Sequence, residues 1–252
     1  GFGIDTRTSG GNAFTLTATH GLTFADDHYS TITGGNSGIS ALNQGTGALS
    51  ITSTGSVTGN YGHGVDALNR NAGTELTIAA AGASGRDNGI FAENRGTGAL
   101  SVTATGSVTG TYFRGIAALN GTLYSPSGTD LTIAAADATG QSAGIFARNY
   151  GSGALSISAS GTVTGTGVAY TPALRDPGVY ARNDHGTDLA IAVADVSGEV
   201  SGIYARNRGS GALSVSASGT VTSRSGHGVR ARNDNGTDLA IAVAAVSGAS
   251  RG

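Results

Sequence analysis

The sequence predicts an all-β fold, a right-handed parallel β-helix with three strands per coil of about 25 residues. Three observations support this prediction. A Gly followed by Ile or Val recurs along the chain, apolar residues alternate with small polar ones inside each repeat, and Gly is abundant while Trp and Met are absent. A self-similar period of this length marks a solenoid, in which each repeat buries its apolar face against its neighbours.

The repeated phrase opens at Gly38, Gly64, Gly89, Gly115, Gly144, Gly178, Gly202 and Gly228. Coils of two kinds alternate. One kind reads G-[IV]-x-A-x-N and later A-L-S-[IV], as in residues 144–164, and the other continues T-[DE]-L-[TA]-I-A, as in residues 178–198. Each coil holds three stretches with a period of two residues, which is strand periodicity and not helix periodicity.

In the first two stretches of one coil, Ile145 and Leu155 are predicted to face inward, and Val163 faces inward from the third stretch. Successive coils would stack about 4.8 Å apart, so the equivalent residues form inward columns. An Asn ends every first stretch, at Asn43, Asn69, Asn94, Asn120, Asn149, Asn183, Asn207 and Asn233. Because an amide both donates and accepts, we expect these residues to form a structural ladder.

A single domain is predicted, with residues 1–37 as a diverged N-terminal coil and residues 38–252 as continuous β-helix repeats. The segment Phe14 to Ala18 fits a first strand, followed by a longer excursion through residues 25–28. The last residues match those that precede another opening Gly, so we expect the chain to be a segment of a longer array.

Two insertions lengthen the basic repeat, at residues 121–127 and 166–177. Both are predicted to project from corners and not from the core, with Tyr124 and Tyr170 as exposed aromatics. All three Pro residues lie in or beside these interruptions, as expected for a residue that cannot donate to a strand ladder.

Charge and composition exclude several classes of function. The net charge is only −2, and no apolar run is long enough to span a membrane, so neither nucleic acid nor membrane is an expected partner. Cysteine is absent, which removes disulfide and thiolate chemistry. The five His residues do not group in the repeat pattern, so we expect no metal site and no cofactor.

Parallel β-helices also carry polysaccharide lyases and hydrolases, so an enzyme is the alternative hypothesis. Acidic residues precede the inward Leu in alternate coils, at Glu75, Asp130, Asp188 and Asp238, and would lie about 10 Å apart. They recur with the repeat, whereas an active site normally interrupts one. Catalysis is therefore not expected.

The outward side of the second stretch alternates between hydroxyl coils such as Ser156-Ser158-Ser160 and mainly Ala coils such as Ala190-Ala192-Ala194. A flat face of small side chains suits lateral self-association. Ice binding would need regular Thr rows, and here every second row is mainly Ala.

The phrases G-I-F-A-R-N, G-S-G-A-L-S-I-S-A-S-G-T-V-T-G and G-T-D-L-A-I-A-V-A resemble the passenger domains of Gram-negative autotransporters and related β-strand-repeat surface proteins. The resemblance covers about residues 38–252. It implies a right-handed β-helix, which agrees with the crossover preference of parallel strands. It also implies an extracellular location on the outer cell surface, and a role as stalk, adhesin or biofilm filament.

Aromatic and Arg residues follow one outward face in four consecutive coils. The predicted binding residues are Phe146, Arg148, Tyr180, Arg182, Tyr204, Arg206 and Arg232. Like charges about 5 Å apart repel unless they are offset, and Glu93, Asp184 and Asp234 supply a local offset. The alternative is that the strip binds an extended acidic glycan on a host or neighbouring cell, because Arg binds sulfate and carboxylate bidentately.

Overall fold

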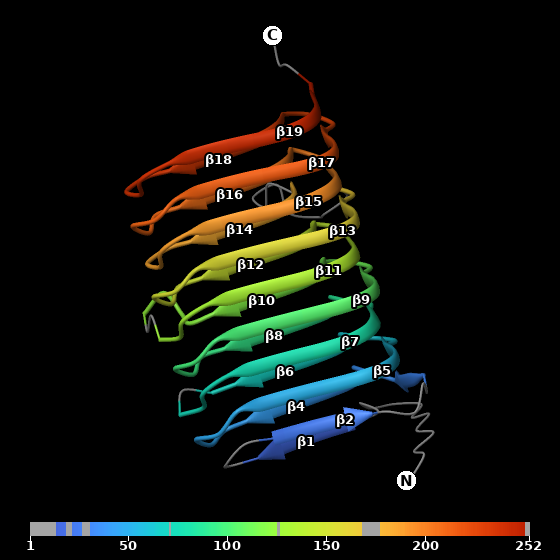
Figure 1. Cartoon of the computed structure of the whole chain (residues 1–252). Coiled ribbons are helices and arrows are strands. Elements are labelled where there is room, and N and C mark those ends of the chain that lie inside the picture. The colour runs from blue at the N-terminus through green and yellow to red at the C-terminus, as the bar shows by residue number, and fades with distance from the viewer. Residues whose placement is uncertain are drawn as a thin grey trace.

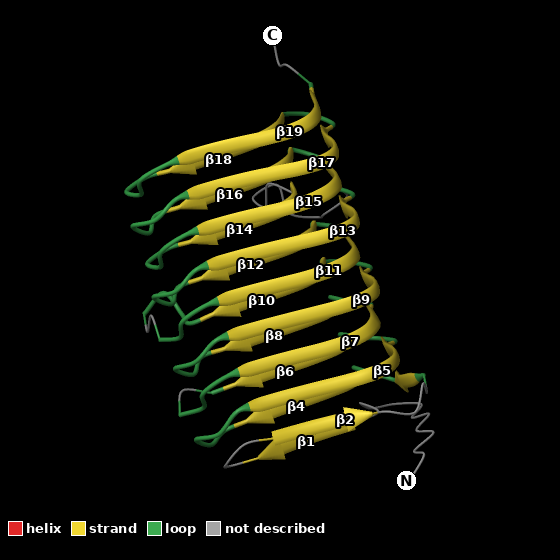
Figure 2. Cartoon of the chain, viewed as in Figure 1, coloured by secondary structure: helices red, strands yellow, loops and turns green. Residues whose placement is uncertain are grey.

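A computed structural model of the chain describes residues 14–18, 22–26, 31–70, 72–124, 127–167 and 177–249. The fold is a parallel β-solenoid of about eight turns with about 26 residues per turn, and its described residues include no helix (Figures 1 and 2). The predicted fold class is thereby confirmed.

Short strands from successive coils form a nine-stranded parallel sheet, here called the short-strand sheet. Its register aligns the repeated phrases residue by residue, so that Ile145 lies beside Val179 and Asn149 beside Asn183. In order, the strands are β1 (Phe14–Ala18), β4 (Ile39–Asn43), β6 (Val65–Asn69), β8 (Ile90–Asn94), β10 (Arg114–Asn120), β12 (Ala143–Asn149), β14 (Pro177–Asn183), β16 (Ser201–Asn207) and β18 (His227–Asn233).

From β5 onward, the second and third stretches of each coil join into one long strand, so the three sides of these coils are built from two strands. These form a ten-stranded long-strand sheet. Its strands are β2 (Leu22–Asp26), β5 (Leu49–Gly59), β7 (Leu76–Gly85), β9 (Leu100–Gly110), β11 (Leu131–Gly140), β13 (Leu155–Gly165), β15 (Leu189–Gly198), β17 (Leu213–Ser223) and β19 (Leu239–Gly248), with β3 (Ile32–Gly34) paired to β5.

From β5 onward, each long strand is interrupted by a shift of register, which separates the second side of the coil from the third. Strands of 11 and 10 residues alternate, so the extra residue must be accommodated at every step. Asp137 and Asp195 lie at these shifts, and each carboxylate accepts a backbone N–H of the next coil at 2.7 Å, from Thr162 and Thr220 respectively. At such a β-bulge, the backbone N–H bonds to a side chain instead of to the backbone carbonyl of the neighbouring strand.

The core is a set of apolar columns, as the alternation predicts. Ile145 and Val163 have no exposed surface, and Leu155 is 1% exposed. The opening Gly of each coil is explained by close packing, since a Cβ on Gly144 would lie 2.5 Å from Cγ1 of Val163. Only Gly lets the first and third sides meet this closely.

The predicted Asn ladder forms over most of its length. Each amide of Asn43, Asn69, Asn94, Asn120 and Asn149 donates to the side-chain oxygen of the next Asn, at 2.8–3.2 Å, which ends the chain at Asn183. Asn207 and Asn233 instead donate to backbone carbonyls. Asn207 is also fully buried, so it completes the turn without an amide partner.

The N-terminal coil and the insertions agree with the sequence in part. Phe14–Ala18 pairs with β4 as expected, and Ala25 and Asp26, at the start of the predicted excursion, belong to β2 in register with β5. Residues 27 and 28 of that excursion lie outside the described residues. Tyr124 is 94% exposed in the corner between β10 and β11. Pro177 is not in a loop but begins β14, a position that suits its missing N–H. Tyr170 lies outside the described residues.

Candidate functional site

The predicted binding residues lie together on the outer face of the short-strand sheet, in two parallel columns. Phe146 is in register with Tyr180, which is in register with Tyr204. Two residues further along the strands, Arg148, Arg182 and Arg206 form the second column, which ends at Arg232. We call the seven predicted residues the basic strip.

The aromatic column is a continuous stack. The rings of Phe146 and Tyr180 are 4.7 Å apart, and those of Tyr180 and Tyr204 are 5.0 Å apart, each pair nearly parallel. A guanidinium covers each end, with Arg114 4.1 Å from the Phe146 centroid and Arg230 5.6 Å from that of Tyr204. Cation–π attraction and ring stacking hold these side chains in one orientation.

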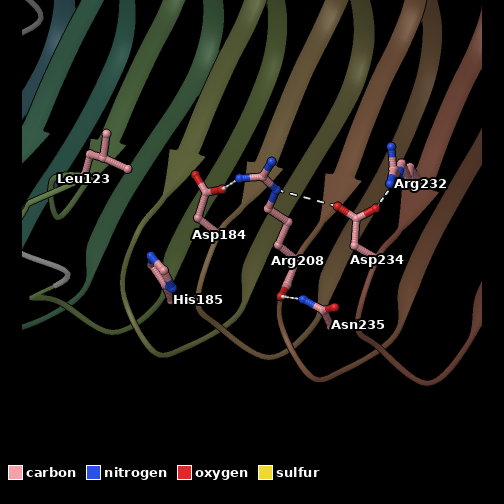
Figure 3. A pocket seen from close by; sticks show the side chains of 7 residues that line it. All are labelled: Leu123, Asp184, His185, Arg208, Arg232, Asp234 and Asn235. Atoms are coloured by element: carbon pink, nitrogen blue, oxygen red, sulfur yellow. Dashed lines mark hydrogen bonds and ion pairs between the residues drawn. The ribbon is translucent and has the colours of Figure 1, made fainter.

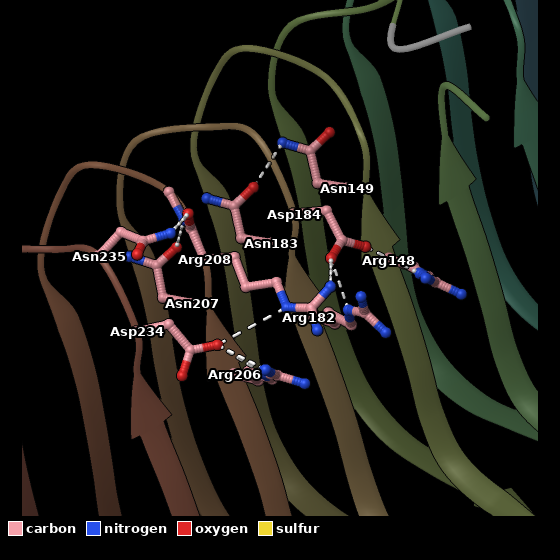
Figure 4. A network of polar contacts seen from close by, with 11 residues as sticks. Arg148, Asn149, Arg182, Asn183, Asp184, Arg206, Asn207, Arg208, Asp234 and Asn235 are labelled. Atoms are coloured by element: carbon pink, nitrogen blue, oxygen red, sulfur yellow. Dashed lines mark hydrogen bonds and ion pairs between the residues drawn. The ribbon is translucent and has the colours of Figure 1, made fainter. Parts of the chain in front are cut away.

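Two carboxylates lie between the Arg residues of the second column (Figure 4). Asp184 accepts from Nε of Arg182 at 2.6 Å and from Nε of Arg148 at 3.0 Å. Its side chain is only 3% exposed. Although burial acts in the opposite direction, the hydrogen bond to Asp184 raises the pKa of Arg182.

Asp234 has the same role two coils further along the solenoid. It pairs with Arg206 at 2.7 Å and with Nε of Arg232. Arg208 connects the two acidic residues, lying 3.5 Å from Asp184 and 3.6 Å from Asp234. Burial would raise the pKa of Asp234, but hydrogen bonding and charge attraction from Arg206 and Arg232 outweigh it and lower that pKa.

The network remains cationic in spite of these pairs. Five guanidinium groups, those of Arg148, Arg182, Arg206, Arg208 and Arg232, face two carboxylates, which leaves a net charge of +3. The local offset predicted from Asp184 and Asp234 is therefore real but incomplete. Glu93, also predicted to contribute, pairs with Arg95 instead. In most of these pairs the carboxylate takes the Nε edge, and a guanidinium has five N–H donors, so donors remain for another acceptor.

An open recess of about 610 Å³ lies where the network reaches the corner turns (Figure 3). Arg208 and Arg232 line it together with Asp184, Asp234, Leu123, His185 and Asn235. Side chains from several turns contribute, so the recess follows the axis of the solenoid. Such a shape suits a chain better than a compact molecule.

Sequence analysis did not find Arg208, Arg114 or Tyr150, although all three contact the strip or its acids. The signal for Arg208 was present, because the position after each ladder Asn reads Asp184, Arg208 and Asp234 in three consecutive coils. The backbone confirms this column, because the N–H of each of these residues donates to the carbonyl oxygen of the ladder Asn in the preceding coil. Tyr150 packs under Arg148, whose guanidinium is 4.4 Å from the ring centroid.

Two of the four acidic residues of the alternative enzyme hypothesis have structural contacts. Asp130 and Asp188 each accept a backbone N–H of the next coil at 2.7 Å, from Ala154 and Ala212. These two carboxylates join neighbouring coils. Within the described ranges, no group of three or more His, Asp or Glu residues is arranged to hold a metal ion.

Comparison of the chain with protein-family models, curated proteins and solved structures finds no significant match in any of the three. In the described part of the chain, no helix is long and apolar enough to cross a membrane. The geometry of the strip is therefore the basis for a functional proposal.

Proposed function

We propose that this chain is a non-catalytic, extracellular β-solenoid that binds extended acidic polysaccharide along the basic strip. The observation that supports this proposal is the pairing of two columns, a stack of three aromatic rings beside Arg residues that exceed their acidic partners. The face therefore keeps a net positive charge that an anionic partner could neutralise.

The spacing of the columns fits a linear polymer. Coils repeat about every 4.8 Å, so guanidinium groups follow one another at a distance similar to one sugar unit. Sulfate and carboxylate groups accept bidentate hydrogen bonds from Arg, while sugar faces pack on aromatic rings. Because most ring and guanidinium positions are fixed by stacking and by the Asp pairs, little side-chain entropy would be lost on binding.

The biological setting is a further part of the proposal. The repeat phrases resemble those of autotransporter passenger domains, and a parallel β-solenoid is compatible with that family. The chain would then serve on the outer surface of a Gram-negative bacterium, as a stalk, adhesin or filament that contacts a host or neighbouring cell. The small-residue face of the long-strand sheet would be available for lateral self-association.

The test is retention on a heparin-like matrix at low salt, with the double variant Arg182→Gln and Arg206→Gln. We expect retention to be lost. A control with the same change of charge is Arg70→Gln with Arg224→Gln, since both residues lie outside the strip and the Arg224 side chain is 82% exposed. This control is expected to be retained almost as well as the parent protein.

Stability must be measured beside binding, because both strip residues pair with buried or half-buried acids. We expect the double variant to lose about 1–2 kcal/mol and to remain folded. If the unmodified protein shows no salt-sensitive retention on any acidic polysaccharide, the proposed function is wrong. Equal loss of retention in the control pair would show general charge attraction and would contradict a specific strip.

A further inference from the structure

A second cluster of aromatic rings and a guanidinium lies at the corner where long strands lead into the short-strand sheet. Tyr61, Arg86 and Tyr112 come from three consecutive turns. The guanidinium of Arg86 is 5.7 Å from the ring centroid of Tyr61 and 5.1 Å from that of Tyr112. Tyr61 is 67% exposed and Tyr112 is 43% exposed, so the cluster faces solvent.

Arg86 differs from the Arg residues of the basic strip in having no acidic partner among the described residues. Among the described residues no carboxylate lies within 4.0 Å of it, and its side chain contacts two exposed rings instead. Both rings keep exposed surface beside this guanidinium. The corner thus combines a guanidinium that has no carboxylate partner among the described residues with exposed aromatic surface, and the strip has the same two kinds of side chain.

The corner cluster and the strip are linked by neighbouring residues. Phe113 follows Tyr112 and is 47% exposed, and Arg114 follows Phe113. The guanidinium of Arg114 then covers the ring of Phe146, which begins the aromatic stack. The backbone of Ser142, next to β12, bonds to Phe113 and fixes this connection.

We propose that Tyr61, Arg86, Tyr112 and Phe113 form a second binding site for the same acidic polysaccharide, which extends the strip across the corner. This inference rests on the proposed function and adds to it a requirement for chain length. The path from Tyr61 to Arg230 spans about six coil steps, or about 29 Å at the strand spacing. A short oligosaccharide fills the strip alone, whereas a long one reaches the corner as well.

The experiment compares heparin oligosaccharides that span about two coils with others that span about eight coils. Affinities are measured by calorimetry at low salt for the parent protein and for the double variant Tyr61→Ala and Tyr112→Ala. We expect the double variant to bind the long oligosaccharide at least about tenfold more weakly, because exposed aromatic anchors carry a large share of binding energy. Its affinity for the short oligosaccharide should not change. Arg86→Gln should act in the same direction.

Tyr124→Ala is the matched control, because Tyr124 is an exposed Tyr on the opposite corner. It should leave both affinities unchanged. If the parent protein binds both lengths and the double variant matches it, the corner site is refuted while the proposed function stands. If the parent protein binds neither length, both proposals are wrong. Weaker binding of the short oligosaccharide by the double variant would also contradict a separate corner site.

Discussion

The two halves of the short-strand sheet have the same core and different outer faces. In the N-terminal half, β4 to β10, the outward columns read Ser40, Asp66, Phe91, Ala117 and Leu42, Leu68, Glu93, Leu119. In the C-terminal half, β12 to β18, they read Phe146, Tyr180, Tyr204, Arg230 and Arg148, Arg182, Arg206, Arg232. Because inward positions are fixed by packing, the repeat leaves its outward positions free to take on binding chemistry.

The turns differ in the same way. Up to Asn183 each ladder amide bonds to the next, whereas Asn207 and Asn233 bond to backbone. The change coincides with the turns in which Asp184, Arg208 and Asp234 follow the ladder. The acidic residues in these turns offset the positive charges of the Arg column. The ladder of amide–amide hydrogen bonds ends at the turn where these acidic residues begin. Four predictions test this contrast.

The largest effect should come from the core, and it should be equal in both halves. Ile90→Asp and Ile145→Asp each place a charge in a column with no exposed surface, which should destabilise the fold by several kcal/mol. Ser158→Asp, on an exposed outward position, should change the melting temperature little. Thermal unfolding followed by circular dichroism provides the measurement. Comparable losses for Ser158→Asp and Ile145→Asp would contradict the assignment of inward and outward faces.

The next effect should distinguish the halves. Asp184→Asn leaves Arg148, Arg182 and Arg208 without their shared acid, and we expect a loss of about 1–2 kcal/mol that becomes smaller in high salt. Glu93→Gln removes a single pair with Arg95, whose side chain is 37% exposed, and should cost about 0.5 kcal/mol or less. Urea denaturation at two salt concentrations measures both.

Asp184→Asn also tests the role of the strip. Removing the internal acid makes the guanidinium groups more available, so affinity for acidic polysaccharide should rise although stability falls. A face that is merely solvated would show the loss of stability only.

The two halves should also respond to pH with opposite signs. Attraction from Arg206 and Arg232 lowers the pKa of Asp234, so its ionised form stabilises the fold above the unfolded value of about 3.9, and this contribution disappears as pH falls through the lowered pKa. Burial raises the pKa of Asp66. His63 lowers it by a smaller amount, and Glu93 raises it. Ionised Asp66 therefore costs stability as pH rises through its pKa.

Asp234→Asn should accordingly destabilise the protein by about 1 kcal/mol at pH 7 and have no effect near pH 2. Asp66→Asn should stabilise it at pH 7 by about 0.5 kcal/mol or less, and this gain should vanish near pH 3. Melting temperatures across this pH range measure both variants. The same sign for both at pH 7 would show that the outer faces do not differ electrostatically as described.

The sequence predicted the positions in these columns better than their contacts. A period of two residues within a repeat assigns Ile145 inward and Arg148 outward without further information. It does not say that Arg148 reaches Asp184 in the next coil, because a long side chain spans one or two strand spacings. The cluster at Tyr61, Arg86 and Tyr112 was missed for another reason. Corner residues share no phrase from coil to coil, so no column revealed them.

The smallest effect should come from the loop at the boundary between the halves. Residues 123–126 belong to the insertion between β10 and β11, and their removal brings that turn close to the basic repeat. Gly121 and Gly128, with φ of +74° and +98°, remain to form the bends. Shortening a loop of this size changes closure entropy by about 0.5 kcal/mol. The melting temperature should therefore change by only a few degrees, and retention on heparin should persist.

A variant that keeps the loop length but replaces residues 123–126 with Gly and Ser separates the effect of loop length from the effect of losing the side chains. Failure of the deletion to fold, with the replaced loop folding normally, would show that the insertion is needed to join two otherwise continuous halves.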